Sequence, residues 1–110
     1  MKLSVIIPVY NSEATIALLV AKLQQALQGI LFEIVMINDG SGDHSEKICT
    51  GLAEQFSNVR FISLRRNYGE FNAVMCGLNW VQGAYCVMID DDFQNPPEEI
   101  LKLLEMAETG

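Results

Sequence analysis

Three consecutive carboxylates, Asp90, Asp91 and Asp92, are the residues of this sequence best suited to chemistry. Adjacent carboxylates repel one another, so crowding them is costly unless a cation or strong hydrogen-bond donors offset the charge. Residues two apart in an extended chain point the same way, so Asp90 and Asp92 can face one site while Asp91 faces elsewhere. Such oxygen ligands suit Mg²⁺ or Mn²⁺. The cluster predicts a divalent-metal site, and a solvated turn ahead of a helix is the alternative.

The residues around the acidic cluster indicate a strand before it and a helix after it. The apolar run 84–89 has the length of a strand buried on both faces, which would bring the acids out where a parallel sheet meets solvent. After the acids, Asn95 can cap a helix, the prolines 96–97 preset its first turn, and the glutamates 98–99 lie at the positive end of its dipole.

Length and composition describe one domain with a single packed core. The chain has 110 residues, of which 50% are hydrophobic and 19% charged, and this composition argues against disorder. Its longest apolar runs are strand-sized, well short of the ~20 residues that a transmembrane helix requires. The net charge of -7 disfavours nucleic-acid binding, which needs basic residues. Cys49, Cys76 and Cys86 lack metal-ligand spacing and lie in apolar helix or strand patterns, which predicts buried, reduced thiols in a cytoplasmic protein.

The hydrophobic pattern predicts strands that alternate with helices. The expected strands are residues 2–10, 32–38, 59–64 and 84–89. Apolar residues recur with helical spacing within residues 16–27, 48–56, 71–81 and 100–107. This alternation predicts an α/β fold, in which right-handed crossovers build a parallel sheet that is covered on both sides.

Polar clusters follow the end of each expected strand. They are Tyr10 with Asn11, then residues 39–43, 65–68 and 90–94. Ligands of such sheets bind outside the carboxyl ends of the strands, where the strand order reverses. We therefore expect one ligand site at this edge, since four solvated turns in these places would be a coincidence.

Several residues of these clusters have ordinary alternatives. Asp43 is predicted to cap the second helix in a capping box with Glu46, which leaves Asp39 for a ligand. His44, the only histidine, is interpreted as a surface residue and not as a catalytic base. The arginines 65–66 could pair with surface acids, but a strand exit suits contact with a diphosphate.

Three common binding motifs are absent from the sequence. The segment that begins at Asp39 has His44 where a calcium loop of the EF-hand type needs glycine, and Thr50 where that loop needs its bidentate acid. The first strand exits without the glycines of a dinucleotide fingerprint, and no Gly-Lys-Ser or Gly-Lys-Thr forms a P-loop.

Taken together, four segments resemble the donor-binding half of a family 2 glycosyltransferase with the GT-A fold. They are residues 5–13 (VIIPVYNSE), 37–43 (INDGSGD), 66–69 (RNYG) and 89–98 (IDDDFQNPPE). The long match from Arg66 to Glu99 most resembles the dolichyl- and undecaprenyl-phosphate sugar transferases. Asn38 departs from the family pattern, in which an acid is common at this position. The resemblance implies an incomplete, Rossmann-like GT-A fold, with residues 1–110 as the donor-binding part.

The resemblance also implies site residues. Pro8, Tyr10 and Glu13 would line the nucleotide-base pocket, and Asp39 would accept a hydrogen bond from the base. Asp90 and Asp92 match the Asp-x-Asp motif of the family, whose acids hold the metal. The full set of implied substrate-binding residues is Pro8, Tyr10, Glu13, Asp39, Arg66, Gly69, Asp90, Asp91 and Gln94.

The implied activity is metal-dependent transfer of a sugar, with inversion, from a nucleoside-diphosphate sugar to a polyprenyl phosphate or a growing cell-surface glycan. UDP is more common than GDP in the family, and Mg²⁺ or Mn²⁺ would stabilise the departing diphosphate. We expect the general base and the acceptor-binding part to lie beyond residue 110, so no catalytic residue is assigned and the chain alone should be inactive. A nucleotide-sugar binding module without catalysis and a metal-binding domain are the alternatives.

The expected partners are the nucleotide-sugar donor and the lipid-phosphate or glycan acceptor, with no nucleic acid. A homo-oligomer is left open. We expect a cytoplasmic protein, which would reach the cytoplasmic face of the membrane only through parts beyond residue 110.

Overall fold

The computed structural model describes residues 3–40, 42–64, 75–89 and 97–109. Within these ranges the strands are β1 (Leu3–Val9), β2 (Phe32–Asn38), β3 (Val59–Ser63) and β4 (Tyr85–Met88). The helices that are described as whole elements are α1 (Ile16–Ala26), α2 (Ser45–Gln55) and α4 (Pro97–Thr109). Strands and helices alternate as expected, which confirms the α/β class.

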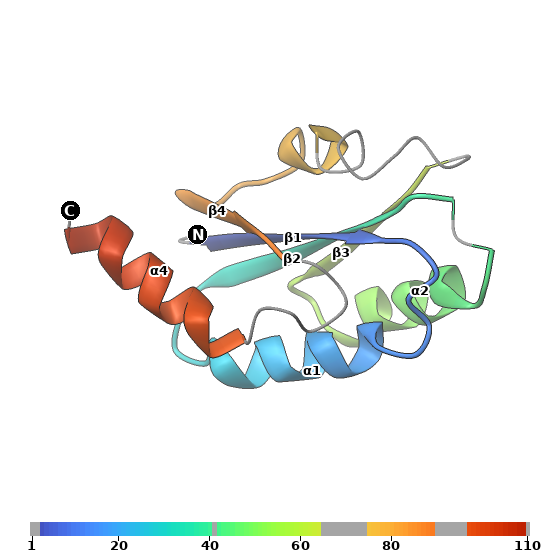
Figure 1. The fold of residues 1–110 in the computed structure, drawn as a ribbon, viewed down its shortest axis with the longest axis horizontal. Coiled ribbons are helices and arrows are strands. Elements are labelled where there is room, and N and C mark those ends of the chain that lie inside the picture. The colour runs from blue at the N-terminus through green and yellow to red at the C-terminus, as the bar shows by residue number, and fades with distance from the viewer. Residues whose placement is uncertain (1–2, 41, 65–74, 90–96, 110) are drawn as a thin grey trace.

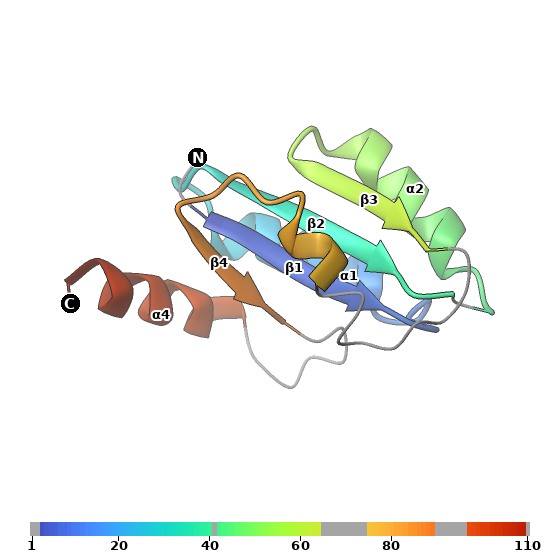
Figure 2. The ribbon, with the colours of Figure 1, turned by 90° about the horizontal axis from the view of Figure 1, so that it is seen from above.

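The strands form one parallel sheet in the order β3-β2-β1-β4 (Figures 1 and 2). The chain adds β2 and β3 on one side of β1 and then returns to add β4 on the other side. The strand order therefore reverses between β1 and β4, which is where sheets of this kind bind their ligands. All four strands run the same way, so their carboxyl ends lie along one edge of the sheet (Figure 2).

The two faces of the sheet are covered by different segments. Helices α1, α2 and α4 lie on one face, and the segment that contains the helical residues 75–78 lies on the other (Figure 1). Alternate residues of each strand supply the two sides, as the pleat requires. Val5, Ile7 and Val9 of β1 belong to the core beneath α1 and α2, and Ile6 belongs to the smaller core beneath residues 75–81.

Strands β1 and β2 are the buried centre of the sheet. Every residue of both strands is buried, including three polar ones, Ser4, Glu33 and Asn38. Pro8 lies opposite Ile37 of β2. It comes after Leu3–Ile6, the part of β1 that pairs with β4. The missing N–H of Pro8 is tolerable here, because Pro8 lies one residue before the end of β1.

Strand β4 differs from its prediction. An apolar run that reads as buried on both faces is largely exposed, with Tyr85 36% and Met88 46% accessible, and Ile89 just after the strand is the buried residue at 3%. The physical reason is position, because β4 is an edge of the described sheet and β1 is its one described neighbour. Apolar composition alone does not distinguish an edge strand from a central one. None of the described helices is long and apolar enough to cross a membrane.

Candidate functional site

The candidate site lies at the carboxyl ends of β1 and β2, where two loops are fastened together. The backbone N–H of Asp39 donates to the carbonyl oxygen of Val9 at 2.8 Å, so the first residue after β2 is held against the last residue of β1. Asp39 is only 3% exposed. The structure thus keeps Asp39 beside the end of β1, as its predicted part in a shared ligand site requires.

Asn38, directly before Asp39, is used within the sheet. It is 2% exposed, its Nδ2 donates to Ser63 Oγ at 3.2 Å, and its carbonyl oxygen accepts from the N–H of Leu64 at 2.9 Å. The amide in place of an acid therefore links the ends of β2 and β3. This contact ties the exit of β3 to the same edge as Asp39.

Hydrogen bonds fasten the loop after β1 to the loop after β2 and to the first residue of α2, Ser45. Asn11 Oδ1 accepts from the N–H of Gly42 at 2.7 Å, and the N–H of Ser12 donates to Ser45 Oγ at 2.7 Å. Asp43 Oδ2 accepts from the N–H of Glu13 at 3.1 Å. Asn11 has a φ of +51°, a left-handed conformation that asparagine tolerates better than most residues. The two loops therefore form one unit around Asp39.

The capping box predicted for Asp43 and Glu46 is wrong. Helix α2 begins at Ser45 with His44 at the N-cap, and no side-chain capping bond forms there. Asp43 instead accepts from the N–H of Ser45 through Oδ1 at 2.9 Å, while its Oδ2 is occupied by Glu13. Because His44 and not Asp43 is the N-cap, Glu46 is only the second residue of the helix, and the spacing that a capping box needs is not met.

The environment of Asp43 stabilises its charged form. Partial burial acts to raise the pKa of its carboxyl, but hydrogen bonds from the side chain and backbone of Ser45 and from the backbone of Glu13 outweigh burial. The net effect is a pKa below the usual value of 3.8. At neutral pH the charged Asp43 carboxylate thus holds the loop after β1 against the start of α2.

The side chain of Glu13, a predicted part of the base pocket, contacts His44. Glu13 Oε2 lies 2.8 Å from His44 Nδ1 and accepts from the backbone N–H of His44 at 3.2 Å. The His44 side chain is 79% exposed, which confirms its interpretation as a surface residue. Exposed pairs of this kind contribute little to stability. The chemical effect of this contact is to hold the Glu13 carboxylate at the start of α2.

Tyr10 remains accessible to a ligand. Its side chain is 50% exposed, while its backbone N–H donates to Ser12 Oγ at 3.3 Å and its carbonyl oxygen accepts from the same hydroxyl at 3.2 Å. This local turn holds the backbone and leaves the ring at the surface. Pro8, also predicted to line the base pocket, is buried in β1.

The remaining predicted site residues lie outside the described residues. They are Arg66, Gly69, Asp90, Asp91, Asp92 and Gln94, and with them Arg65. In the described part of the chain no group of three metal-ligating side chains could hold an ion. What the structure does describe is the approach to the acids, because the N–H of Ile89 donates to the carbonyl oxygen of Ile6 at 3.0 Å. Ile89, the last described residue before the acids, therefore lies beside β1. The carboxylate donors of the acidic segment fit a hard divalent ion.

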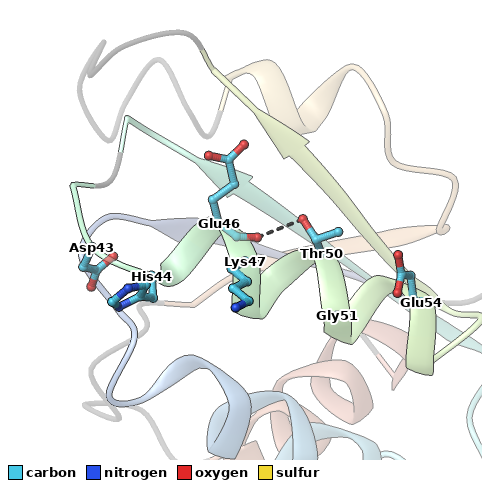
Figure 3. A pocket seen from close by; sticks show the side chains of 7 residues that line it. All are labelled: Asp43, His44, Glu46, Lys47, Thr50, Gly51 and Glu54. Atoms are coloured by element: carbon cyan, nitrogen blue, oxygen red, sulfur yellow. Dashed lines mark hydrogen bonds between the residues drawn. The ribbon is translucent and has the colours of Figure 1, made fainter.

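A hollow on the outer side of α2 is a different surface. It is lined by Asp43, His44, Glu46, Lys47, Thr50, Gly51 and Glu54 (Figure 3). Thr50 Oγ1 within it donates to the carbonyl oxygen of Glu46 at 2.9 Å. Three carboxylates against one lysine would repel an anionic diphosphate. The hollow is also open, so it is not the candidate donor site.

Sequence reasoning missed polar residues of the interior, among them Ser45 and Glu33. Ser45, which is fully buried, joins α2 to the loop after β1, and nothing in its sequence context separates it from an ordinary first-turn serine. Glu33 is 2% exposed, and a charged residue within the otherwise apolar strand β2 was a signal that could have found it. Charged side chains are rarely buried unless they are paired.

Comparison with known proteins adds relatives of the whole chain. A model of glycosyl transferase family 2 matches residues 4–110. An undecaprenyl-phosphate 4-deoxy-4-formamido-L-arabinose transferase from Yersinia enterocolitica is 39% identical, over 99% of this chain and 34% of the relative. The protein of the same name from Photorhabdus laumondii is 42% identical with the same coverage. The chain thus spans about one third of the length of these curated relatives.

Solved structures show the same fold. S. aureus TarS 1–349 in complex with UDP-GlcNAc matches with a TM-score of 0.78 at 27% identity, over 99% of this chain and 32% of that chain. A second match is glucosyl-3-phosphoglycerate synthase from Mycobacterium tuberculosis in complex with Mn²⁺, UDP and glucosyl-3-phosphoglycerate. Its TM-score is 0.79 at 25% identity, and the match covers 99% of this chain and 40% of that chain. These are GT-A enzymes, which confirms the expected fold. Because the family model matches this chain over nearly its whole length, residues 4–110, the chain belongs to glycosyl transferase family 2.

Proposed function

We propose that residues 1–110 are the donor-binding part of an enzyme that transfers a sugar from a nucleoside-diphosphate sugar to a polyprenyl phosphate. One observation carries the proposal. The strand order reverses between β1 and β4, so Tyr10, Asp39 and the acidic segment after Ile89 all arise at one edge of the sheet. A nucleotide that lies along this edge can meet Asp39 with its base and the acids with its diphosphate.

The choice of donor and acceptor draws on the relatives. The TarS and glucosyl-3-phosphoglycerate synthase structures contain UDP or a UDP-sugar, which supports UDP over GDP. The curated relatives are named as undecaprenyl-phosphate transferases, which supports a polyprenyl phosphate over a glycan acceptor. We propose that the acceptor-binding part lies in the portion of such enzymes that this chain does not cover.

The chain's own residues would bind and orient the donor. Asp39, held against Val9, would accept a hydrogen bond from the base, and the exposed Tyr10 ring would cover it. Asp90 and Asp92 would hold Mg²⁺ or Mn²⁺, which when bound supplies Lewis-acid stabilisation of the leaving diphosphate. Binding the donor at both ends would hold the anomeric carbon in one orientation. Such positioning of the reacting atoms lowers the activation barrier of the transfer.

The transfer itself would be a displacement with inversion. An oxygen of the acceptor phosphate forms a bond to the anomeric carbon while the bond to the nucleoside diphosphate breaks, and the bonding electron pair leaves with the diphosphate. A phosphate acceptor is already anionic, so it needs no general base to remove a proton.

The test is calorimetric titration of UDP and GDP into the chain, with Mn²⁺ and with chelator. We expect UDP to bind in the presence of Mn²⁺ and to lose most of its affinity with chelator. Asp92→Asn should abolish the metal-supported part of this affinity, because it removes a charged metal ligand. Glu54→Gln neutralises an exposed carboxylate on the outer side of α2 and is the matched control. Equal UDP affinity in the wild type and Asp92→Asn would refute the proposed metal site.

A further inference from the structure

The buried carboxylate of Glu33 lies far from the carboxyl ends of the strands, near the start of β2. Its Oε2 accepts from Ser4 Oγ at 2.6 Å and from the backbone N–H of Gln82 at 2.6 Å. Its Oε1 lies 3.3 Å from Arg60 Nη2, a charge contact without hydrogen-bond geometry. Burying a charge is costly unless it is paired and hydrogen-bonded, so this arrangement needs a reason.

The partners of Glu33 all act on the short segment that leads into β4. Besides the bond from Gln82 to Glu33, the N–H of Gly83 donates to Ser4 Oγ at 2.8 Å. Arg60 Nη1 donates to the carbonyl oxygen of Trp80 at 3.2 Å. Side chains from β1, β2 and β3 therefore hold three backbone groups of residues 80–83. We call Ser4, Glu33 and Arg60 the entry anchor.

The contact between the entry anchor and the segment is close. A Cβ placed on Gly83 would lie 2.6 Å from the backbone nitrogen of Ser4 and 2.7 Å from its Oγ, nearer than real Cβ atoms come. The chain therefore crosses over the start of β1 at one defined place. Two residues later β4 begins and pairs with β1 from Tyr85 opposite Leu3 to Met88 opposite Ile6.

Strand β4 alone has little to set its register. It is four residues long, and β1 is its one neighbour among the described strands. A slip of one residue would move its carboxyl end by about 3.3 Å and turn every side chain to the other face. The acids at 90–92 follow β4 directly, so such a slip would move them relative to Asp39, which is fixed separately through Val9.

We propose that the entry anchor sets the register of β4 and so the position of the acidic segment relative to Asp39. Ser4, Glu33 and Arg60 are positioning residues, because they act at the amino-terminal edge of the sheet and reach the donor only through β4. The functional half of this inference rests on the proposed donor site. The structural half, that the anchor holds β4, stands on the contacts alone.

The test compares Ser4→Ala with Gln24→Ala. Ser4→Ala removes the hydroxyl that joins Glu33 to Gly83. Gln24→Ala removes a polar pair of similar kind, Gln24 Nε2 to Asn58 Oδ1 at 2.7 Å, which does not touch β4. Should Ser4→Ala fail to fold, Arg60→Gln is the second variant. It removes the charge contact with Glu33, and the Arg60 side chain is partly exposed, so the substitution disturbs the core less. Two readouts are measured under conditions where every variant is folded: hydrogen exchange of the amides of residues 82–89, and the affinity for UDP with Mn²⁺.

The expected result is faster exchange over residues 82–89 in Ser4→Ala, together with roughly tenfold weaker UDP binding, since small misplacements in a site have large effects. Gln24→Ala should change neither. Wild-type UDP affinity in Ser4→Ala would overturn the positioning role, and unchanged exchange would overturn the anchor. If the wild type itself does not bind UDP, the proposed function fails, and the exchange comparison still decides whether the anchor holds β4.

Discussion

Asn11 adopts a left-handed backbone conformation and uses its side-chain oxygen to hold the N–H of Gly42 at 2.7 Å, thirty-one residues away. The loop after β1 is thereby shaped by the loop after β2. The hydrogen bond between Asn11 and Gly42 therefore stabilises the conformation of both loops.

Asn11→Gly and Asn11→Ala should destabilise the chain to different extents. Both remove the bond to Gly42, a loss of about 1 kcal/mol in the free energy of unfolding. Alanine also pays for a φ of +51°, which adds roughly 1 kcal/mol, whereas glycine adopts it freely. Urea unfolding of the variants measures the difference. Equal loss in both would mean that the left-handed conformation at Asn11 carries no cost.

Two glycine-to-alanine substitutions should have opposite signs. Gly83→Ala should lower the free energy of unfolding by about 1–3 kcal/mol, because the new methyl would overlap the backbone of Ser4. Gly51→Ala lies in the exposed part of α2 with nothing within 4 Å, so it should raise stability by up to ~1 kcal/mol through helix propensity. Thermal unfolding gives both values, and a neutral Gly83→Ala would contradict the close crossing described for this segment.

Asp43→Asn should matter at neutral pH and not in acid. The pKa of Asp43 lies below 3.8 in the folded chain, because hydrogen bonds from Ser45 and Glu13 outweigh partial burial. Its stabilising effect is therefore present above pH 3.8 and is lost as the pH falls through the lowered folded pKa. We expect the variant to unfold at a lower temperature than the wild type at pH 7.

The same comparison repeated at falling pH is the check on Asp43. The gap between the two melting temperatures should close as the wild-type carboxyl takes up its proton. Glu54→Gln, on the same helix and exposed, controls for the loss of one negative charge. A gap that stayed constant down to strong acid would show that Asp43 acts by shape and not by charge.

Cys86 should react slowly with alkylating reagents although it is exposed. Partial burial, and after it the negative charge of Glu33, raise the pKa of its thiol above the usual 9.0. Since the thiolate is the reactive form, the pH midpoint of its alkylation should lie above that of a free cysteine. Peptide mass spectrometry follows each cysteine separately, and a midpoint at or below that of N-acetylcysteine would contradict the environment described for Cys86.

The strands show how much the sequence determines here. Strand β2 was predicted at its observed bounds, Phe32–Asn38, and β1 and β3 within one residue at each end, because their apolar runs end at polar loops. The polar clusters after the expected strands also placed Tyr10 and Asp39 at one edge, and the parallel sheet brings them there. These are features of local pattern and of chain connectivity, which a single sequence carries.

What the sequence did not predict depends on contacts across the fold. The run 84–89 is apolar in either case, and only the sheet order makes β4 an exposed edge among the described strands. Asp43 has the spacing of a capping box, but Glu13 from another loop takes one of its oxygens. Glu33 within an apolar strand indicates a buried charge, but the sequence does not indicate that Ser4 and Gln82 are its partners. In each case the deciding residue is distant in the sequence.

The exposed side of β4 also governs how this chain behaves in concentrated solution. As an edge of the described sheet with accessible Tyr85 and Met88, β4 can pair with the same edge of another molecule. The net charge of -7 opposes such contact by mutual repulsion. Salt shortens the range of that repulsion to about 10 Å at 0.1 M. The chain should therefore stay dispersed in dilute buffer and become prone to precipitation as salt is added.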